Sequence, residues 1–161
     1  MEITIKDIGL KEANGNRVFH IYVQDPYYRM NIGQMYHTND LPVRRFYCGH
    51  KCRIEQIAEE QRNSENSRLG KVFPSRYKCL FVCDEHSVRY WYKYYEKHNP
   101  TARPRIYELE VNGKIFWTYA ELLRTSAYWD INILRNMQEY EGLFEGEYTV
   151  IQEKQYDDFD D

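Results

Sequence analysis

Two short segments near opposite ends of the chain carry side chains that could do chemistry. His20 is the titratable residue inside an apolar run, Val18-Phe19-His20-Ile21. Glu139 and Glu141 are one residue apart at the expected start of a strand, where both carboxylates would share one face. A carboxylate can stabilise positive charge that develops in a reaction, and a neutral imidazole can hold a hydroxyl group. The alternatives are a core histidine with satisfied hydrogen bonds and two surface carboxylates.

Common catalytic motifs are absent from the sequence. It has neither GxGxxG nor GxxxxGKS/T, so it lacks the glycine-rich loops of Rossmann and P-loop sites. The motifs HExxH and GxSxG are also missing. An enzyme with this sequence would therefore hold a phosphate group by another device.

The four cysteines form two CxxxC pairs, Cys48 with Cys52 and Cys79 with Cys83. Zinc needs ligands within about 2.3 Å of one ion. The segment 77–83 is typical of a strand with a rise of about 3.3 Å per residue, so Cys79 and Cys83 would lie roughly 13 Å apart. Buried thiols are therefore favoured and no metal is expected. Because no secretory signal is visible at the N-terminus, a reducing cytoplasmic location is expected, without disulfides.

Length and composition favour one globular domain. The chain has 161 residues, of which 42% are hydrophobic and 29% are charged, and no apolar run approaches the roughly 20 residues of a membrane span. Sixteen tyrosines raise the aromatic content to 16%, which favours interfaces and clefts for flat ligands. Residues 1–151 are expected to form the domain, and the acidic residues 152–161 a flexible tail.

Basic residues are concentrated in the middle of the chain. The net charge is −3, yet residues 44–105 contain fourteen lysines and arginines against seven aspartates and glutamates. Such a basic stretch suits an anionic ligand, for example a nucleotide phosphate or a nucleic acid. The alternative is a solvated helix face and loop.

The order of the predicted elements indicates an α+β fold with a mostly antiparallel split sheet and flanking helices. Helices are expected over 53–61, from Asp84 to about residue 98, from a capping box at Thr118–Glu121, and over 126–138. Strands are expected over 17–23, 77–83, 105–111, 114–117, 140–144 and 147–151. Asn112-Gly113 predicts a tight hairpin turn, and Gly146 is expected to separate the last two strands.

Taken together, the ordered segments resemble the ADP-ribosyltransferase superfamily, which includes bacterial mono-ADP-ribosylating toxins and poly-ADP-ribose polymerases. The resemblance spans about residues 17–151 and extends to small bacterial and phage members. In that family a first-strand His or Arg holds the NAD ribose, and a catalytic Glu begins a late strand, often as Gln/Glu-x-Glu. By position, His20 and Glu141 match these residues, with Glu139 as the upstream acid. Phe81 stands where one subgroup has a stacking Tyr, and the Ser-Thr-Ser triplet is missing.

The resemblance implies a mono-ADP-ribosyltransferase that uses NAD as its substrate. It implies catalytic roles for His20, Tyr77 and Glu141, since breaking the nicotinamide–ribose bond leaves positive charge on the sugar that a carboxylate can stabilise. The implied NAD-binding residues are His20, Tyr22, Ser75, Arg76, Phe81 and Glu139. Tyr77 or Phe81 would stack on nicotinamide, and Arg76 would pair with the diphosphate. For each of these residues the alternative is core packing or a turn after Pro74.

Three functions remain open at this level. The first is ADP-ribosyl transfer to a protein or nucleic-acid acceptor, as expected of a toxin or phage effector. The second is a catalytically silent binding or inhibitor protein, of the kind found in phages and mobile elements, that acts through a tyrosine-rich surface. The third is a small nucleic-acid-binding module, in which lysines and arginines follow phosphates and tyrosines stack on bases. None of them involves a membrane.

Overall fold

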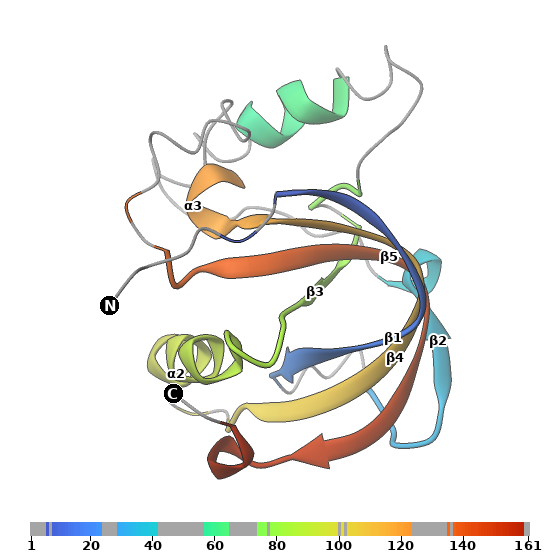
Figure 1. The fold of residues 1–161 in the computed structure, drawn as a ribbon, viewed down its shortest axis with the longest axis vertical. Coiled ribbons are helices and arrows are strands. Elements are labelled where there is room, and N and C mark those ends of the chain that lie inside the picture. The colour runs from blue at the N-terminus through green and yellow to red at the C-terminus, as the bar shows by residue number, and fades with distance from the viewer. Residues whose placement is uncertain are drawn as a thin grey trace.

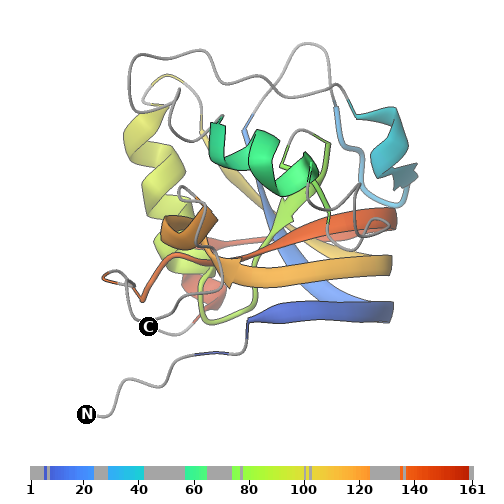
Figure 2. The same cartoon turned by 90° about the horizontal axis from the view of Figure 1, so that it is seen from above.

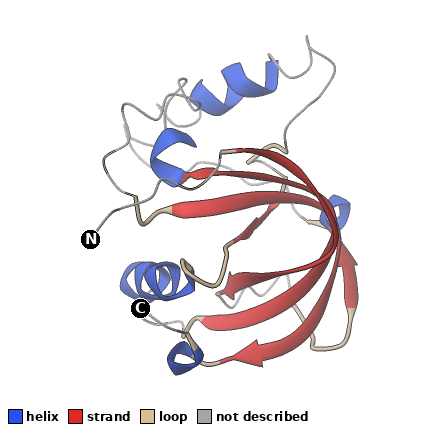
Figure 3. Cartoon of the chain, viewed as in Figure 1, coloured by secondary structure: helices blue, strands red, loops and turns tan. Residues whose placement is uncertain are grey.

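The computed structural model describes residues 6, 8–23, 29–41, 57–64, 74–76, 78–99, 101, 103–123, 135 and 137–159. Its strands are β1 (Gly9–Tyr22), β2 (Met35–His37), β3 (Leu80–Val82), β4 (Arg105–Tyr119) and β5 (Tyr140–Lys154). The named helices are α2 (Val88–His98), α3 (Ala120–Leu123) and the 3-10 helices η1 (Thr38–Asp40) and η3 (Tyr156–Asp158). Residues 57–64 are also helical. The described residues thus form a small α+β domain with few helices, as Figure 3 shows.

An antiparallel sheet with the order β1-β4-β5-β2 forms the framework of the domain. The sheet curls, and β3 crosses between its two arms (Figure 1). On one arm β3 pairs with the first part of β5, for example Phe81 with Leu143. On the other arm Cys83, directly after β3, exchanges two backbone hydrogen bonds of 3.0 and 2.8 Å with Phe19 of β1. The short strand β3 therefore ties the beginning of β5 to the end of β1.

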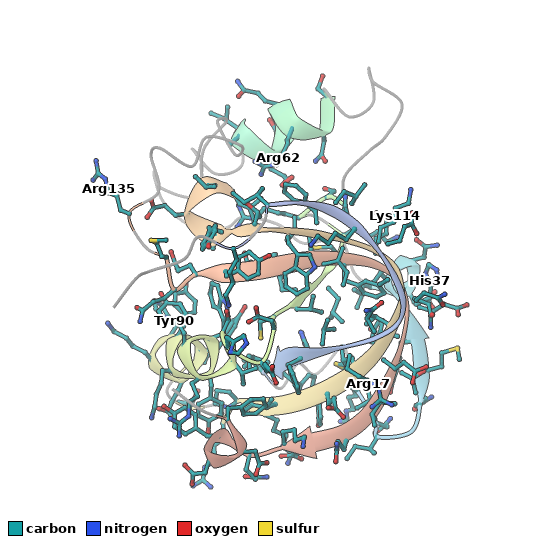
Figure 4. The ribbon with its side chains drawn as sticks, viewed as in Figure 1. Arg17, His37, Arg62, Tyr90, Lys114 and Arg135 are labelled. Carbon is teal, nitrogen blue, oxygen red and sulfur yellow. The ribbon has the colours of Figure 1, made fainter. Side chains whose placement is uncertain are left out.

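Glycines mark the bend of the sheet and not the ends of strands. Gly113 of β4 lies opposite Gly146 of β5, with φ angles of 150° and 147°. A Cβ atom on either residue would lie 2.2 Å from a backbone carbonyl oxygen of the partner strand. In β1 a bulge between Asn14 and Asn16 places Gly15, with φ of 73°, at the same level. Figure 4 labels Lys114 and Arg17 on either side of this bend.

The predicted hairpin at Asn112-Gly113 and the predicted break at Gly146 were therefore wrong. Each pair of expected strands is one continuous strand, β4 or β5, of fifteen residues. Glycine supplies the left-handed φ and the absent Cβ that both a tight turn and a close crossing of two backbones require. The local sequence signal is the same for the two structures.

Three apolar clusters form the core. One fills the inside of the curl, one lies between α2 and the sheet, and one lies beneath α3. In the second cluster Trp91 and Val88 of α2 pack toward Phe19 and Ile21 of β1. The i, i+3 spacing of Val88 and Trp91 puts both on the buried side of the helix, as their pattern predicted.

The C-terminal segment packs on the domain, although its charge predicted a flexible tail. Strand β5 runs to Lys154, and η3 follows it next to α2 (Figure 1). Phe159 is 8% exposed, and its ring meets that of Phe19 edge-on with 5.0 Å between the centroids. Two aromatic residues, Tyr156 and Phe159, thus anchor a segment whose net charge alone indicated solvent exposure.

The three remaining helix predictions have different outcomes. The helix expected over 53–61 is confirmed for residues 57–61 and continues to residue 64. The short helix expected after Thr118 is present as α3 (Ala120–Leu123). Its capping box does not form, because β4 continues to Tyr119 and the buried Thr118 Oγ1 has no hydrogen-bond partner among the described residues. The helix expected over 126–138 falls mostly outside the described residues, as do Cys48 and Cys52. None of the helices in the described part of the chain is long and apolar enough to cross a membrane.

Candidate functional site

A shallow pocket opens where β3, the start of β5 and α2 meet, with about 230 Å³ of empty space that includes open solvent at its mouth. Its walls are apolar and aromatic apart from one carboxylate and one thiol; its lining residues are Ile21, Phe81, Val82, Cys83, Trp91, Tyr95 and Glu141. Glu141 is 7% exposed, so its carboxylate belongs to the interior of the molecule and not to the surface. Figure 2 shows from above how α2 lies beside the sheet at this place.

Each side chain of the pocket is positioned by regular structure. Residues Trp91 and Tyr95 are four apart on α2 and so project from one side of the helix. The indole Nε1 of Trp91 donates a 2.8 Å hydrogen bond to the backbone carbonyl of Tyr140, which fixes α2 against the beginning of β5. The next residue is Glu141. Since Val82 pairs with Gly142, Cys83 and Glu141 occupy neighbouring positions on adjacent strands.

Burial and the charges around the pocket shift the pKa of Cys83. Burial raises the pKa of this thiol well above its ordinary value, and the negative charges of Asp84 and Glu141 raise it further. Lys6 lowers the same pKa; its Nζ lies 2.9 Å from Asp84 Oδ2. Cys83 is therefore a neutral thiol at physiological pH, unsuited to nucleophilic attack or metal binding. Among the described residues no group of three His, Cys, Asp or Glu side chains could hold a metal ion.

We expect the raised pKa of Cys83 to make stability depend on pH. The thiolate forms more readily in the unfolded chain, so the free energy of unfolding should fall as the pH rises above about 8.5. The slope from this one group is at most about 1.4 kcal/mol per pH unit. This slope is measured by urea unfolding of the wild type and of Cys83→Ala between pH 7 and 9.5. The variant should have the shallower slope, and equal slopes would contradict the assignment.

His20 lies beside this pocket but does not line it. Its Nδ1 donates a 2.7 Å hydrogen bond to the backbone carbonyl of Phe81, whose side chain is part of the pocket wall. The hydrogen must be on Nδ1, because a carbonyl oxygen only accepts. Among the described residues of β1, Ile21 lines the pocket. Side chains alternate between the two faces of a strand, so the neighbouring His20 points to the opposite face of β1. His20 thus ties β1 to β3 and fixes the position of Phe81.

The structure brings Phe81 and Glu141 together and places the other predicted NAD-binding residues elsewhere. Tyr22 is buried inside the curl, with its ring 5.5 Å from that of Tyr107. Glu139 is 4% exposed and directly precedes β5. Ser75 and Arg76 lie in a separate cluster, and Tyr77 falls outside the described residues.

That cluster is built around a buried ion pair. Arg62 Nη2 lies 2.9 Å from Glu59 Oε1, and the two side chains are 4% and 1% exposed. Both Arg62 and Arg76 donate to the backbone carbonyl of Leu123 at the end of α3, at 3.1 and 3.4 Å. Arg76, predicted to hold a diphosphate, therefore joins the segment 74–76 to α3. Figure 4 labels Arg62 on the helix above the sheet.

Sequence reasoning missed five lining residues of the pocket as site residues, namely Ile21, Val82, Cys83, Trp91 and Tyr95. Trp91 and Tyr95 were visible as an aromatic stripe after a predicted strand, a pattern that equally indicates core packing. Cys83 was interpreted only as a buried thiol. The signal that distinguishes these residues is their adjacency to Glu141, which arises from the β3–β5 pairing and is not local in sequence.

Comparison with known sequences places the chain in a family. Residues 47–158, more than half of the chain, match the family described as a protein of unknown function, DUF2441, and the chain belongs to that family. The matched region contains α2 and the strands β3, β4 and β5, with all lining residues of the pocket except Ile21. A search of curated proteins gives no match.

Proposed function

We propose that this member of the DUF2441 family is an ADP-ribosyltransferase-like enzyme that binds NAD and transfers its ADP-ribosyl group to an acceptor. The observation that carries the proposal is the buried carboxylate of Glu141, which begins a late strand and lines an aromatic pocket. The order of the supporting elements agrees with this proposal. Strand β3 lies between β1, which carries His20, and β5, which carries Glu141.

The lining of the pocket suits one ring of the dinucleotide. The nicotinamide ring of NAD is flat and carries a positive charge. Aromatic side chains such as Trp91 attract a cation over their faces, and the negative charge of Glu141 adds to that attraction. The rest of NAD would extend outside the pocket.

Glu141 acts on the sugar in this proposal. When the bond between nicotinamide and ribose breaks, its electron pair moves to the pyridinium nitrogen and neutral nicotinamide leaves. Positive charge then develops on the ribose. The carboxylate therefore stabilises the transition state more strongly than the ground state. An acceptor nucleophile forms the new bond to the same ribose carbon and gives up its proton to Glu141 or to water. His20 is a positioning residue, since it acts through the Phe81 carbonyl.

Three small ligands test the charge preference of the pocket. We expect the 1-methylnicotinamide cation to bind more tightly than neutral nicotinamide, and nicotinamide more tightly than the nicotinate anion. A difference of about tenfold between cation and anion, or about 1.4 kcal/mol, is a modest expectation for a buried carboxylate. Quenching of tryptophan fluorescence is the measurement, because Trp91 lines the pocket.

The variant Glu141→Gln is the control for this experiment. It keeps the shape of the side chain and removes its charge, so the three affinities should become similar. Equal affinities in the wild type, or no binding of any of the three, would contradict the proposal. That result would favour a catalytically silent binding protein.

A further inference from the structure

The helix α2 has a second face that the pocket does not use. Tyr90, Tyr94, Lys97 and His98 follow one another at i, i+4, i+7 and i+8, so they lie along one flank of the helix. The ring of His98 stacks on that of Tyr94 with 4.2 Å between centroids and 26° between planes. His98 is exposed, and its Nδ1 is held by the backbone carbonyl of Tyr94 at 2.8 Å. These four residues are called the α2 flank.

Charge is distributed unevenly around α2. Its cations Arg89, Lys93 and Lys97 outnumber its one acid, Glu96. The acids lie toward η3, where Asp157 is 3.8 Å from Arg89 and Glu96 is 3.3 Å from Lys93. Lys97 forms no ion pair with a residue that the structure describes.

The ring of Tyr156 also lies on the η3 side. Arg89 and Lys93 lie over this ring at 4.4 and 4.9 Å from its centroid. The acids and the buried contacts of η3 therefore screen one side of the helix. The opposite flank combines the cation Lys97 with a ring stack in which Tyr94 is half-buried and His98 is exposed.

We propose that the α2 flank binds single-stranded nucleic acid. Proteins that bind single strands combine cations that follow the phosphates with aromatic rings on which unpaired bases stack. The His98–Tyr94 pair is a stack that one base can extend, and Lys97, the neighbour of His98 on the same flank, can meet an adjacent phosphate. An acidic peptide would use the cations but leave the ring stack without a flat partner. A paired duplex would keep its bases from the rings.

The position of the flank also suggests which molecule accepts the ADP-ribosyl group. The same helix supplies Trp91 and Tyr95 to the pocket, so a bound strand lies next to the proposed reaction centre. The strand would then be the acceptor, with a base nitrogen as the nucleophile that bonds to the ribose carbon and loses its proton. This second step rests on the proposed function, whereas binding of the strand does not.

Binding is tested with a fluorescent single-stranded DNA of mixed sequence, about 12 nucleotides long, without NAD. For single strands the slope of log K against log salt concentration is about −0.7 per neutralised phosphate. The variant Lys97→Gln should therefore reduce the magnitude of the slope by about 0.7. The matched control is Lys114→Gln, an exposed lysine at the bend of the sheet, far from α2 (Figure 4), which should leave the slope unchanged.

The stacking role is tested at His98, which is exposed and carries little risk for folding. His98→Ala should weaken binding of the DNA at least about fivefold, and His98→Phe should restore it, because a neutral ring stacks equally well. Failure of the DNA to bind, or equal effects of Lys114→Gln and Lys97→Gln, would overturn the proposal.

The acceptor step has a separate readout. With NAD labelled in its adenylate part, label on the DNA would support the step, and label on an added protein without DNA binding would overturn the whole inference. DNA that binds but gains no label, with no nicotinamide released, would leave the binding surface in place. In that case the proposed enzymatic function would be the part that fails.

Discussion

Glu141→Gln is expected to lower the rate of nicotinamide release from NAD by at least about 100-fold. Glutamine has the shape of glutamate but no charge, so it cannot stabilise the positive charge on the ribose. Removal of one preorganised electrostatic group from an active site costs about 10²–10³ in rate. The rate should be measured at saturating NAD, since the variant also binds the cationic ring more weakly. The loss of transition-state stabilisation then lowers kcat, and the weaker binding of NAD raises KM.

Glu147→Gln is the matched control for this rate measurement. Glu147 is another glutamate of β5, but it is exposed and pairs across the sheet with His37, on the other side of the glycine bend. Its replacement should leave the rate unchanged. Urea unfolding of both variants verifies that they fold. Equal rates for the wild type and Glu141→Gln would remove Glu141 from the mechanism, and no release by the wild type would remove the enzymatic proposal.

The sequence predicted those elements whose pattern is local. The apolar stripe after Asp84 predicted α2, and Asp84 does accept hydrogen bonds from the backbone of His86 and Ser87 just before that helix. The alternation after Arg105 predicted β-structure there, and β4 begins at Arg105. The general class, α+β with mostly antiparallel pairing, follows from these local patterns.

Features that depend on the pairing of distant segments were not predictable in this way. The pocket exists because Cys83 meets Phe19 and Val82 meets Gly142, contacts that span about 60 residues of sequence in each case. Glu141 was identified through a family resemblance, and its burial follows from that pairing. The direction of His20 shows the same limit, since a shift of one residue along a strand reverses the face of every side chain.

Gly113→Ala and Gly146→Ala are expected to destabilise the protein by about 4 kcal/mol or more, or to prevent folding. An added Cβ would lie 2.2 Å from the carbonyl oxygen of Glu145 in the first case and of Asn112 in the second. These oxygens belong to the backbone of paired strands, so the sheet itself would have to open at its bend. The unfavourable φ of alanine at 150° or 147° adds about 1–3 kcal/mol. Urea unfolding, or the yield of soluble protein if a variant does not fold, is the measurement.

Gly33→Ala separates the two causes of this loss. Gly33 also has a positive φ, 86°, but a Cβ there would meet nothing within 4 Å. Its replacement should therefore cost only the conformational part, about 1–2 kcal/mol. If the cost is the same at Gly33 and Gly113, the close approach of β4 and β5 contributes nothing. A cost at Gly113 that exceeds the cost at Gly33 by 2 kcal/mol or more would mean that the paired glycines allow the sheet to curl. That curl brings β3 between β1 and β5 and so creates the pocket of Glu141.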